Sequence, residues 1–308
     1  MTTSPDGPAL CVRPGGERSW VADAVVAGGG RIVDPGEAEA VVWTSPTDPD
    51  GLAGLLRDHP RVRWVQLPFA GIEPYTAVLD DEHTWTCGKG VYATPVAELA
   101  LTLLLGGLRH VHRYARATSW SGPAGRNLVG ARVTVLGGGG IAEEVLRLLG
   151  PFAVDATVVR RHPGPVAGAR RVVGLDELHP ALSDADGVIL ALALTPETRG
   201  VIGAAELDAM ADHSCLVNVA RGAHIVTDDL VRALAAGAIG SVGLDVTDPE
   251  PLPDDHPLWR EPRCTVTPHV GNTPEMAVPL LSARITANVQ RWATGAALLG
   301  PVDVTLGY

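Results

Sequence analysis

The sequence predicts an α/β protein with two domains, each built on a parallel sheet. Short apolar runs alternate with helical segments along the chain, as in strand–helix–strand crossovers. A glycine-rich turn near residue 140 joins one of these apolar runs to a helix. The length of 308 residues suggests about two domains.

The composition excludes several classes of function. The chain is 46% hydrophobic and 19% charged, so it can bury a core and is not disordered. A net charge of −11 argues against nucleic-acid partners, which require a basic surface. The first six residues have no signal-peptide features, and no apolar run reaches the about 20 residues of a membrane span. The four dispersed cysteines indicate free thiols, not a metal site, so we expect a cytoplasmic protein without membrane, nucleic-acid or metal partners.

The first part of the chain predicts strands that alternate with a helix. Strands are expected at residues 9–12, 40–43, 62–67 and 84–87. Residues 50–59 predict a helix, because Leu52, Leu55 and Leu56 share one face.

A long helix is predicted over residues 94–117. Thr94 is expected to cap it, Pro95 to occupy its first position and Glu98 to complete a capping box. Its leucine-rich face predicts burial between domains or subunits. A stretch rich in glycine, proline and serine, residues 119–130, separates the helix from the next strand.

The second part of the chain predicts another α/β unit. Its strands are expected at residues 133–136, 156–159, 188–192, 216–219, 242–246 and 265–267. Helices fit between most of these strands, so this unit has its own sheet.

The glycine-rich turn predicts a dinucleotide phosphate site. In the pattern G-x-G-x-x-A, Gly137 permits a tight turn, Gly139 lets the backbone approach a pyrophosphate, and Ala142 lets the helix pack on the strand. A helix is expected from Glu143 to Leu149, and its N-terminus presents free N–H groups to the phosphates; Gly140 and Ile141, just before it, are assigned to the same site. A plain glycine-rich loop is the alternative, but the strand before the turn and the helix after it favour a dinucleotide.

The end of the next strand favours NADP over NAD. Proteins that bind NAD place a carboxylate there for the ribose 2′-hydroxyl, whereas this chain has Arg160 followed by Arg161. A guanidinium can pair with a 2′-phosphate through two hydrogen bonds. The alternative is that both arginines are solvated and NAD binds.

Three polar residues follow apolar strands in the second unit. Arg221, Glu250 and His269 each come after such a strand, and ligands bind at the carboxyl ends of strands in open α/β sheets. These residues could therefore converge on one crevice. An arginine fork suits a carboxylate, and a histidine beside a carboxylate suits proton exchange. The remaining histidines, His224 among them, are expected to be surface or packing residues.

Over essentially its whole length the chain resembles the D-isomer-specific 2-hydroxyacid dehydrogenases. The matching blocks are the glycine turn, Leu194-Thr195-Pro196-Glu197-Thr198-Arg199-Gly200, Asn218-Val219-Ala220-Arg221-Gly222, Asp245-Val246 with Glu250-Pro251-Leu252-Pro253, and Pro268-His269-Val270-Gly271, together with Val96-Ala97-Glu98 and Ala70-Gly71-Ile72. The arginine pair resembles the glyoxylate/hydroxypyruvate reductase branch, which tends to use NADPH.

The resemblance implies a two-domain architecture with Rossmann-like or flavodoxin-like folds and an active-site cleft between the domains. The substrate domain would be discontinuous, residues 1–93 plus 275–308, and the dinucleotide-binding domain would be residues 94–274. The helix after Pro95 resembles the family's dimerisation element, which implies a homodimer.

The resemblance also implies roles for the site residues. Arg221 would bind the carboxylate and 2-oxo group of a small 2-oxo acid, His269 would donate a proton to the carbonyl oxygen as hydride reaches carbon, and Glu250 would pair with His269. Ala70 and Gly71 would offer backbone N–H groups to the substrate carboxylate. The other residues that it assigns to the cofactor are Leu194, Thr195, Pro196, Val219, Ala220, Asp245 and Gly271.

The sequence departs from the family pattern at one position and leaves the function partly open. Gly140 stands where the family often has a longer polar side chain, so one phosphate contact is in doubt. A formate- or phosphite-type dehydrogenase is one alternative. A non-catalytic, corepressor-like protein that binds a dinucleotide is another.

Overall fold

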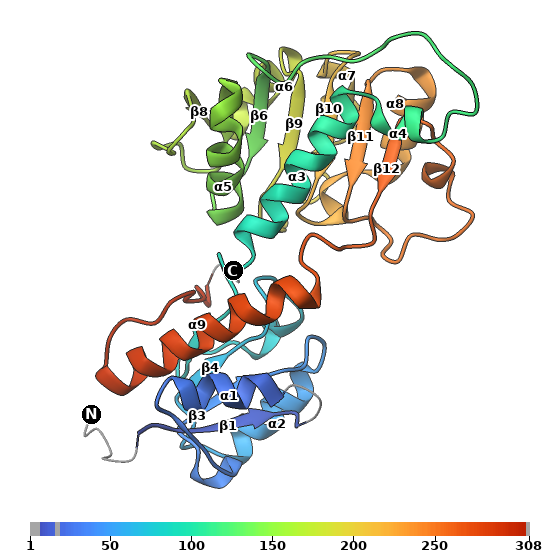
Figure 1. Ribbon diagram of the computed structural model, residues 1–308. Coiled ribbons are helices and arrows are strands. Elements are labelled where there is room, and N and C mark those ends of the chain that lie inside the picture. Colours follow the sequence, from blue (N-terminus) through green and yellow to red (C-terminus); the bar gives the residue numbers. More distant parts are fainter. Residues whose placement is uncertain (1–6, 16–18, 306–308) are drawn as a thin grey trace. The chain divides into compact units, whose positions relative to one another are not determined.

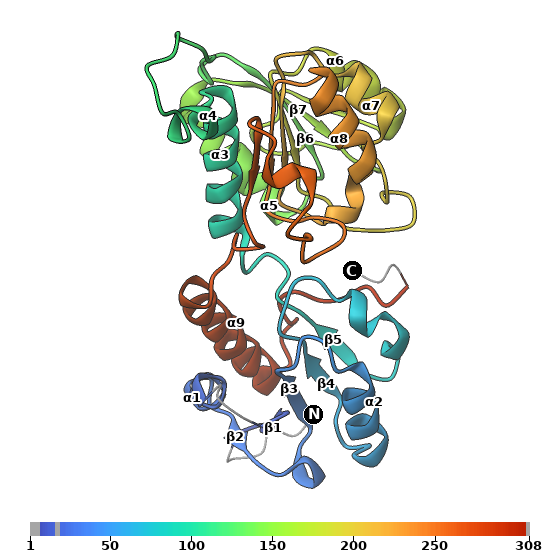
Figure 2. The ribbon, with the colours of Figure 1, turned by 90° about the vertical axis from the view of Figure 1, so that its right-hand side faces the viewer.

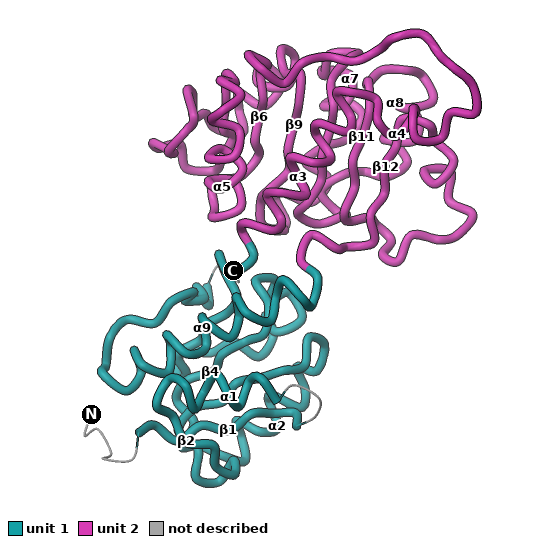
Figure 3. Tube along the Cα trace, viewed as in Figure 1, with its two compact units in different colours: residues 1–92, 273–308 teal, residues 93–272 magenta. Residues whose placement is uncertain are grey.

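The chain forms two compact units in a computed structural model that describes residues 7–15 and 19–305 (Figure 3). Unit 1 combines Met1–Tyr92 with Thr273–Tyr308, and unit 2 is Ala93–Asn272. The sequence predicts a similar division of the chain, with the boundaries after residue 93 and after residue 274. The first six residues, considered above for a signal peptide, lie outside the described part of the chain.

Unit 1 is built on a parallel sheet with the strand order β2-β1-β3-β4-β5, the order of flavodoxin-like folds. Its described strands are β1 (Ala9–Arg13), β2 (Arg31–Ile32), β3 (Ala40–Trp43), β4 (Trp64–Gln66) and β5 (Thr84–Thr86). Its helices are α1 (Ser19–Ala27), α2 (Pro49–Asp58) and α9 (Pro274–Thr294), with 3-10 turns at Pro35–Glu37 and Glu73–Val78. Helices α1 and α9 cover one face of the sheet and α2 the other (Figure 2).

Unit 2 has a parallel sheet in the order β12-β11-β10-β9-β6-β7-β8. Its described strands are β6 (Arg132–Leu136), β7 (Asp155–Val159), β8 (Arg171–Val173), β9 (Gly187–Leu190), β10 (Cys215–Asn218), β11 (Ser241–Leu244) and β12 (Cys264–Val266). Its helices are α3 (Ala93–Leu108), α4 (Val111–Ala115), α5 (Gly140–Leu149), α6 (Leu178–Ser183), α7 (Ala204–Ala209) and α8 (Thr227–Ala236), with 3-10 turns at Gly150–Phe152, Leu175–Glu177, Gly222–His224 and Pro257–Trp259. The strand order reverses between β6 and β9, which is the switch point where Rossmann folds bind ligands.

Alternating side chains of the unit 2 strands build two hydrophobic layers. Val133 and Val135 pack with the helices α3 and α5, whereas Leu136 packs with α6, α7 and α8 on the opposite face (Figures 1 and 2). This alternation follows from the two-residue period of a strand, and both faces are apolar because both are covered by helices.

The long helix predicted over residues 94–117 is interrupted, and this part of the prediction is wrong. Helix α3 already begins at Ala93, so Thr94 does not cap it, and its hydroxyl donates to Glu144 of α5 at 3.0 Å. The helix ends at Leu108, and His110 adopts a left-handed conformation (φ 50°) before α4 begins.

The leucine-rich face of α3 is buried within its own unit. Leu103, Leu104 and Leu108 pack in the layer between the sheet and α5. The prediction that this face is buried between domains or subunits is therefore wrong for these three leucines.

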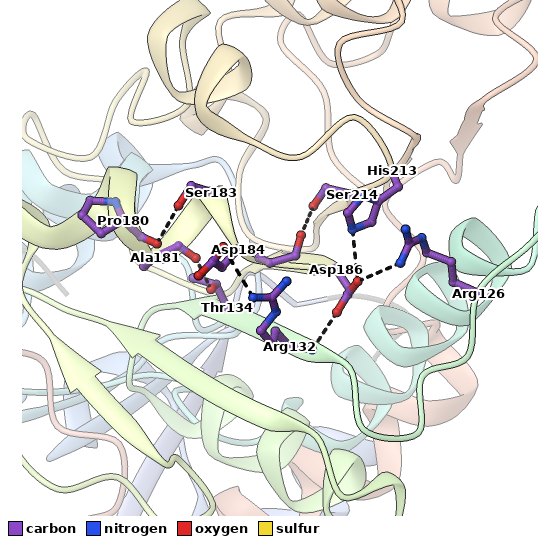
Figure 4. A network of polar contacts seen from close by, with 11 residues as sticks. Arg126, Arg132, Thr134, Pro180, Ala181, Ser183, Asp184, Asp186, His213 and Ser214 are labelled. Carbon is purple, nitrogen blue, oxygen red and sulfur yellow. Dashed lines mark hydrogen bonds and ion pairs between the residues drawn. The ribbon is translucent and has the colours of Figure 1, made fainter.

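A carboxylate at the amino end of β9 joins three segments of unit 2 (Figure 4). Asp186 accepts hydrogen bonds from the backbone N–H of Arg132 at 2.9 Å and from Arg126 at 3.4 Å, and it contacts His213 Nε2 at 3.1 Å. These contacts tie the loop at Arg126, the start of β6 and the segment before β10 together at the amino end of the sheet.

The predicted fold class, two α/β domains on parallel sheets, is confirmed. In the described ranges, no helix combines the length and apolar character needed to cross a membrane.

Candidate active site

Gly137 begins the turn at the carboxyl end of β6, and only glycine fits there. Its φ is +118°, and a Cβ would lie 2.2 Å from the carbonyl oxygen of Ala191, just after β9. Its N–H donates to Val159 at 2.9 Å. The turn is thus held between β7 and β9, the two strands that flank β6.

The rest of the turn is suited to an anion. Gly139 precedes α5 without a capping side chain, and a Cβ there would have no neighbour within 4 Å. The N–H groups of Gly140 and Ile141 belong to the first turn of α5, where intrahelical acceptors are missing. Ala142 is fully buried, so the helix packs closely on the sheet.

The two arginines after β7 (Asp155–Val159) are held differently. Arg160 lies against the glycine turn, since a Cβ on Gly138 would be 3.1 Å from its Cζ and Nε atoms. Arg161 donates to the Glu197 carboxylate at 2.9 Å. In the described part of the chain, no carboxylate pairs with Arg160.

The loop after β9 holds the predicted cofactor residues Leu194, Thr195 and Pro196. The Thr195 N–H donates to the hydroxyl of Thr198 at 2.8 Å, and the Thr195 hydroxyl donates to Glu197 at 2.7 Å. Because β9 neighbours β6, this loop lies next to the glycine turn at the carboxyl edge of the sheet.

His269 and Glu250 are in direct contact. The Nδ1 atom of His269 lies 2.6 Å from Glu250 Oε1, and both side chains are about half exposed. A carboxylate on Nδ1 fixes the orientation of the ring and leaves its Nε2 atom for a second partner.

Asp245 supports the His269 loop. Its carboxylate accepts from the Thr267 hydroxyl at 2.6 Å and from the N–H groups of Val270 and Gly271 at 2.9 Å, and its backbone carbonyl accepts from the His269 N–H at 2.8 Å. His269 itself has a φ of +52°, an uncommon conformation for this residue that the surrounding hydrogen bonds maintain. The buried Asp245 therefore shapes the loop, in addition to the place near the nicotinamide expected for it.

Two buried side chains that the sequence analysis did not assign hold the backbone of Arg221. The Asn218 amide donates to the Arg221 carbonyl at 2.9 Å and accepts from the Ala220 N–H at 3.0 Å. The His224 Nδ1 atom lies 3.2 Å from the Arg221 N atom and 3.0 Å from its carbonyl oxygen. His224 is completely buried and also meets the Ala193 carbonyl at 3.3 Å, so it is more than a packing residue.

The Arg221 loop packs on the segment that leads to Glu250. A Cβ on Gly222 would lie 1.9 Å from the carbonyl group of Thr247, so only glycine allows this approach. The Thr247 N–H in turn donates to Glu250 at 3.3 Å. Arg221, Glu250 and His269 are thus carried by loops at the carboxyl ends of β10, β11 and β12, three adjacent strands. Val219 and Ala220 are buried at the start of the Arg221 loop.

The predicted substrate residues Ala70 and Gly71 belong to unit 1. They lie in the loop that follows β4, where Cys87 Sγ approaches the Ala70 carbonyl at 3.9 Å. Their role in substrate binding, and the cleft expected between the domains, stay predictions.

A hollow of about 410 Å³ lies at the other end of the unit 2 sheet, near the first residues of β6 and β7. Its arginines are neutralised by carboxylates, Arg132 by Asp184 at 3.4 Å and Arg170 by Asp155 at 3.0 Å. We assign it no part in the site, because the glycine turn and His269 lie at the carboxyl ends of the strands.

Comparison with known proteins is consistent with this geometry. Residues 99–271 match the family model of the D-isomer specific 2-hydroxyacid dehydrogenase, NAD binding domain. The chain is 36% identical over 297 residues to an uncharacterized protein in the proB 3′ region of Corynebacterium melassecola, covering 92% of this chain and 95% of that protein. It is 30% identical to glyoxylate/hydroxypyruvate reductase A of Serratia proteamaculans, covering 87% of each.

A solved structure extends the similarity to the whole fold. The D-isomer specific 2-hydroxyacid dehydrogenase from Xanthobacter autotrophicus Py2, solved with NADPH and MES, superposes with a TM-score of 0.85 at 26% identity, over 98% of this chain and 100% of that one. The chain therefore belongs to the D-isomer specific 2-hydroxyacid dehydrogenases, a family of NAD(P)-dependent oxidoreductases, and residues 99–271 form the family's NAD-binding domain.

Proposed function

We propose that the protein reduces a small 2-oxo acid to the 2-hydroxy acid with NADPH, glyoxylate to glycolate or hydroxypyruvate to D-glycerate, or catalyses the reverse reaction. The observation that carries the proposal is the 2.6 Å contact between His269 and Glu250, on loops beside the one that bears Arg221. The glyoxylate/hydroxypyruvate reductase A relative supports this choice of substrate.

The three side chains have distinct roles in the proposed reaction. The Arg221 guanidinium binds the substrate carboxylate and the 2-oxo oxygen, for which its fork geometry is suited. Bound NADPH supplies the hydride. His269 donates the proton on Nε2 to the carbonyl oxygen, and Glu250 holds the ring through Nδ1 and stabilises the imidazolium form. Ala70 and Gly71 supply backbone N–H groups to the substrate carboxylate.

The cofactor residues are proposed on the same basis. The glycine turn with Gly140 and Ile141 binds the pyrophosphate, and the 2′-phosphate of NADP is recognised by the arginines that follow β7, Arg160 with Arg161 beside it. Leu194, Thr195, Pro196, Val219, Ala220, Asp245 and Gly271 complete the cofactor side. The solved Xanthobacter relative was crystallised with NADPH, which supports NADP over NAD.

We also propose that the protein is a cytoplasmic homodimer. Large apolar side chains are exposed on the segment that follows α3, namely Val111, Trp120 and Val129. Their exposure supports a protein partner for this segment, because a partner that covers them would remove apolar surface from water. Four buried free thiols fit a reducing compartment.

A spectrophotometric assay tests the proposed function. Purified protein is mixed with NADPH or NADH and with glyoxylate, hydroxypyruvate, pyruvate or 2-oxobutyrate, and absorbance at the reduced-cofactor band is followed. We expect faster oxidation of NADPH with one of the first two acids. Turnover of formate or phosphite with NADP⁺ would support the other dehydrogenase class, and cofactor binding without any turnover would support a non-catalytic protein.

A further inference from the structure

The ion pair between Arg161 and Glu197 crosses the cofactor side of the glycine turn. Arg161 follows β7 and Glu197 lies in the loop after β9, and these two strands flank β6. The pair therefore spans the carboxyl end of β6, where a dinucleotide binds in this fold. The guanidinium nitrogen lies 2.9 Å from Glu197 Oε2.

Glu197 is held in place by its own loop. The same Oε2 atom accepts from the Thr195 hydroxyl at 2.7 Å, and Thr195 is fixed by Thr198 through a 2.8 Å hydrogen bond. The Thr195 hydroxyl, the backbone N–H of Glu197 and Arg161 together hold the pKa of Glu197 below its usual value. Glu197 is therefore a carboxylate at neutral pH, and it occupies one edge of the Arg161 fork.

Arg160 is in the opposite situation. It has no carboxylate partner in residues 7–15 and 19–305, and it lies over Gly138 within the glycine turn. The two adjacent guanidinium groups thus differ in their availability to a phosphate. Arg160 faces the glycine turn without a carboxylate partner in the described residues, whereas Arg161 is paired with Glu197 from the neighbouring loop.

We infer that Glu197 is a positioning residue that limits selectivity for NADPH: it holds Arg161 away from the 2′-phosphate and leaves Arg160 as the main ligand of that group. The inference rests on the proposed use of NADPH. A ribose 2′-phosphate carries between one and two negative charges at neutral pH and would recruit both arginines if both were available. NADH lacks the phosphate, so Glu197 should affect it far less.

Removing the carboxylate tests the inference. The dissociation constants of NADPH and NADH are measured by calorimetry for the wild type, Glu197→Gln, Arg161→Ala, the double variant and Arg160→Ala. In Glu197→Gln the dissociation constant of NADPH should fall about three- to fivefold relative to the dissociation constant of NADH. An effect of this size corresponds to the free energy of an exposed ion pair. The gain should vanish in the double variant, because it depends on Arg161. Arg160→Ala should weaken NADPH binding by about ten- to a hundredfold.

A matched control and a smaller probe separate this effect from changes in overall charge or folding. Glu177→Gln removes a carboxylate that pairs with Arg171, near the first residue of β8 at the other end of the sheet, and should not alter the NADPH to NADH ratio. 2′,5′-ADP should compete with NADPH more strongly in Glu197→Gln than in the wild type. Competition by 5′-AMP should be unchanged.

The outcomes distinguish the inference from the function on which it rests. An unchanged NADPH to NADH ratio in Glu197→Gln, or a gain that persists in the double variant, overturns the inference while the proposed function stands. Failure of the wild type to bind either nicotinamide cofactor overturns both.

Discussion

Three glycines of the site allow other groups to approach the backbone where a side chain would otherwise stand. Gly137, Gly138 and Gly222 each meet another group where a Cβ would stand: the Ala191 carbonyl, the Arg160 guanidinium and the Thr247 carbonyl. The sequence predicts the first of these, because a glycine turn after a strand is a local pattern. It could not predict the other two, because no local pattern indicates that Arg160 approaches Gly138 or that Thr247 approaches Gly222.

Substitution by alanine should affect two glycines of the same turn differently: at Gly137 it should lower stability, and at Gly139 it should weaken cofactor binding. Gly137→Ala places a Cβ 2.2 Å from a carbonyl oxygen at a positive φ, so the free energy of unfolding should fall by at least about 2 kcal/mol. Gly139→Ala meets no neighbour and should fold normally, but its methyl group would obstruct the pyrophosphate and weaken NADPH binding. Thermal unfolding and calorimetric titration measure the two effects. Equal stability of both variants would contradict the account.

The Glu250 carboxylate should contribute through its charge. Glu250→Gln retains an oxygen that can accept from His269 Nδ1–H but loses the negative charge that stabilises the imidazolium. Because a charged hydrogen bond exceeds a neutral one by roughly 1.4 kcal/mol, kcat for 2-oxo acid reduction should fall about tenfold. The NADPH dissociation constant should stay within twofold of the wild-type value. A kcat equal to that of the wild type would remove Glu250 from the mechanism.

The catalytic candidates were predictable from sequence, but their supports were not. Arg221, Glu250 and His269 stand out because each follows an apolar strand of a parallel sheet. His224 bonds to the backbone of Arg221, but its residue type and neighbours do not distinguish it from the other histidines. The short spacing to Arg221 was the available signal.

Elements that were predicted correctly are those with strong apolar patterns. The buried strand β3 and the amphipathic helix α2 lie where the sequence predicts them, to within one residue. Strand β2 was missed because it has two residues, both exposed, and pairs only at the edge of its sheet. Helix α3 was predicted too long because its end depends on a left-handed His110 and on close packing at Gly107, which apolar periodicity does not reveal.

Adjacent glycines in α3 should also give opposite effects. In Gly106→Ala the Cβ meets nothing within 4 Å, so the gain in helix propensity should stabilise the protein by about 0.5–1 kcal/mol. In Gly107→Ala the Cβ would lie 2.3 Å from Cys215 Sγ and 2.6 Å from Ser241 Oγ, so α3 must move off the sheet, at a cost of about 1–3 kcal/mol. Chemical denaturation of both variants measures the difference. A destabilised Gly106→Ala variant would show that α3 does not pack as described.

At the scale of the whole molecule, each unit contains two buried thiols. Burial raises the pKa of Cys11 in unit 1 and Cys215 in unit 2 to about 11, and that of Cys264 in unit 2 to about 12. Burial also raises the pKa of Cys87 in unit 1. At pH 8 hardly any thiolate is present, and the sulfurs are inaccessible.

A thiol reagent should therefore report on the folding of each unit. At pH 8 the native protein should react at least about 10²-fold more slowly than the denatured chain, which should titrate four thiols. Mass spectrometry at intermediate denaturant then shows which pair of cysteines reacts first, and so which unit opens first. Rapid labelling of any native cysteine would contradict the burial described.

The most direct test of the catalytic site is the steady-state reduction of glyoxylate by NADPH in His269→Ala, with His179→Ala as the matched control. His179 also contacts a glutamate, Glu206 at 2.8 Å, but it lies in α6, outside the proposed site. We expect kcat/KM to fall by about 10²–10⁴-fold in His269→Ala while NADPH still binds, and His179→Ala to behave as the wild type. Undiminished turnover by His269→Ala would contradict the proposed proton donor and the function built on it.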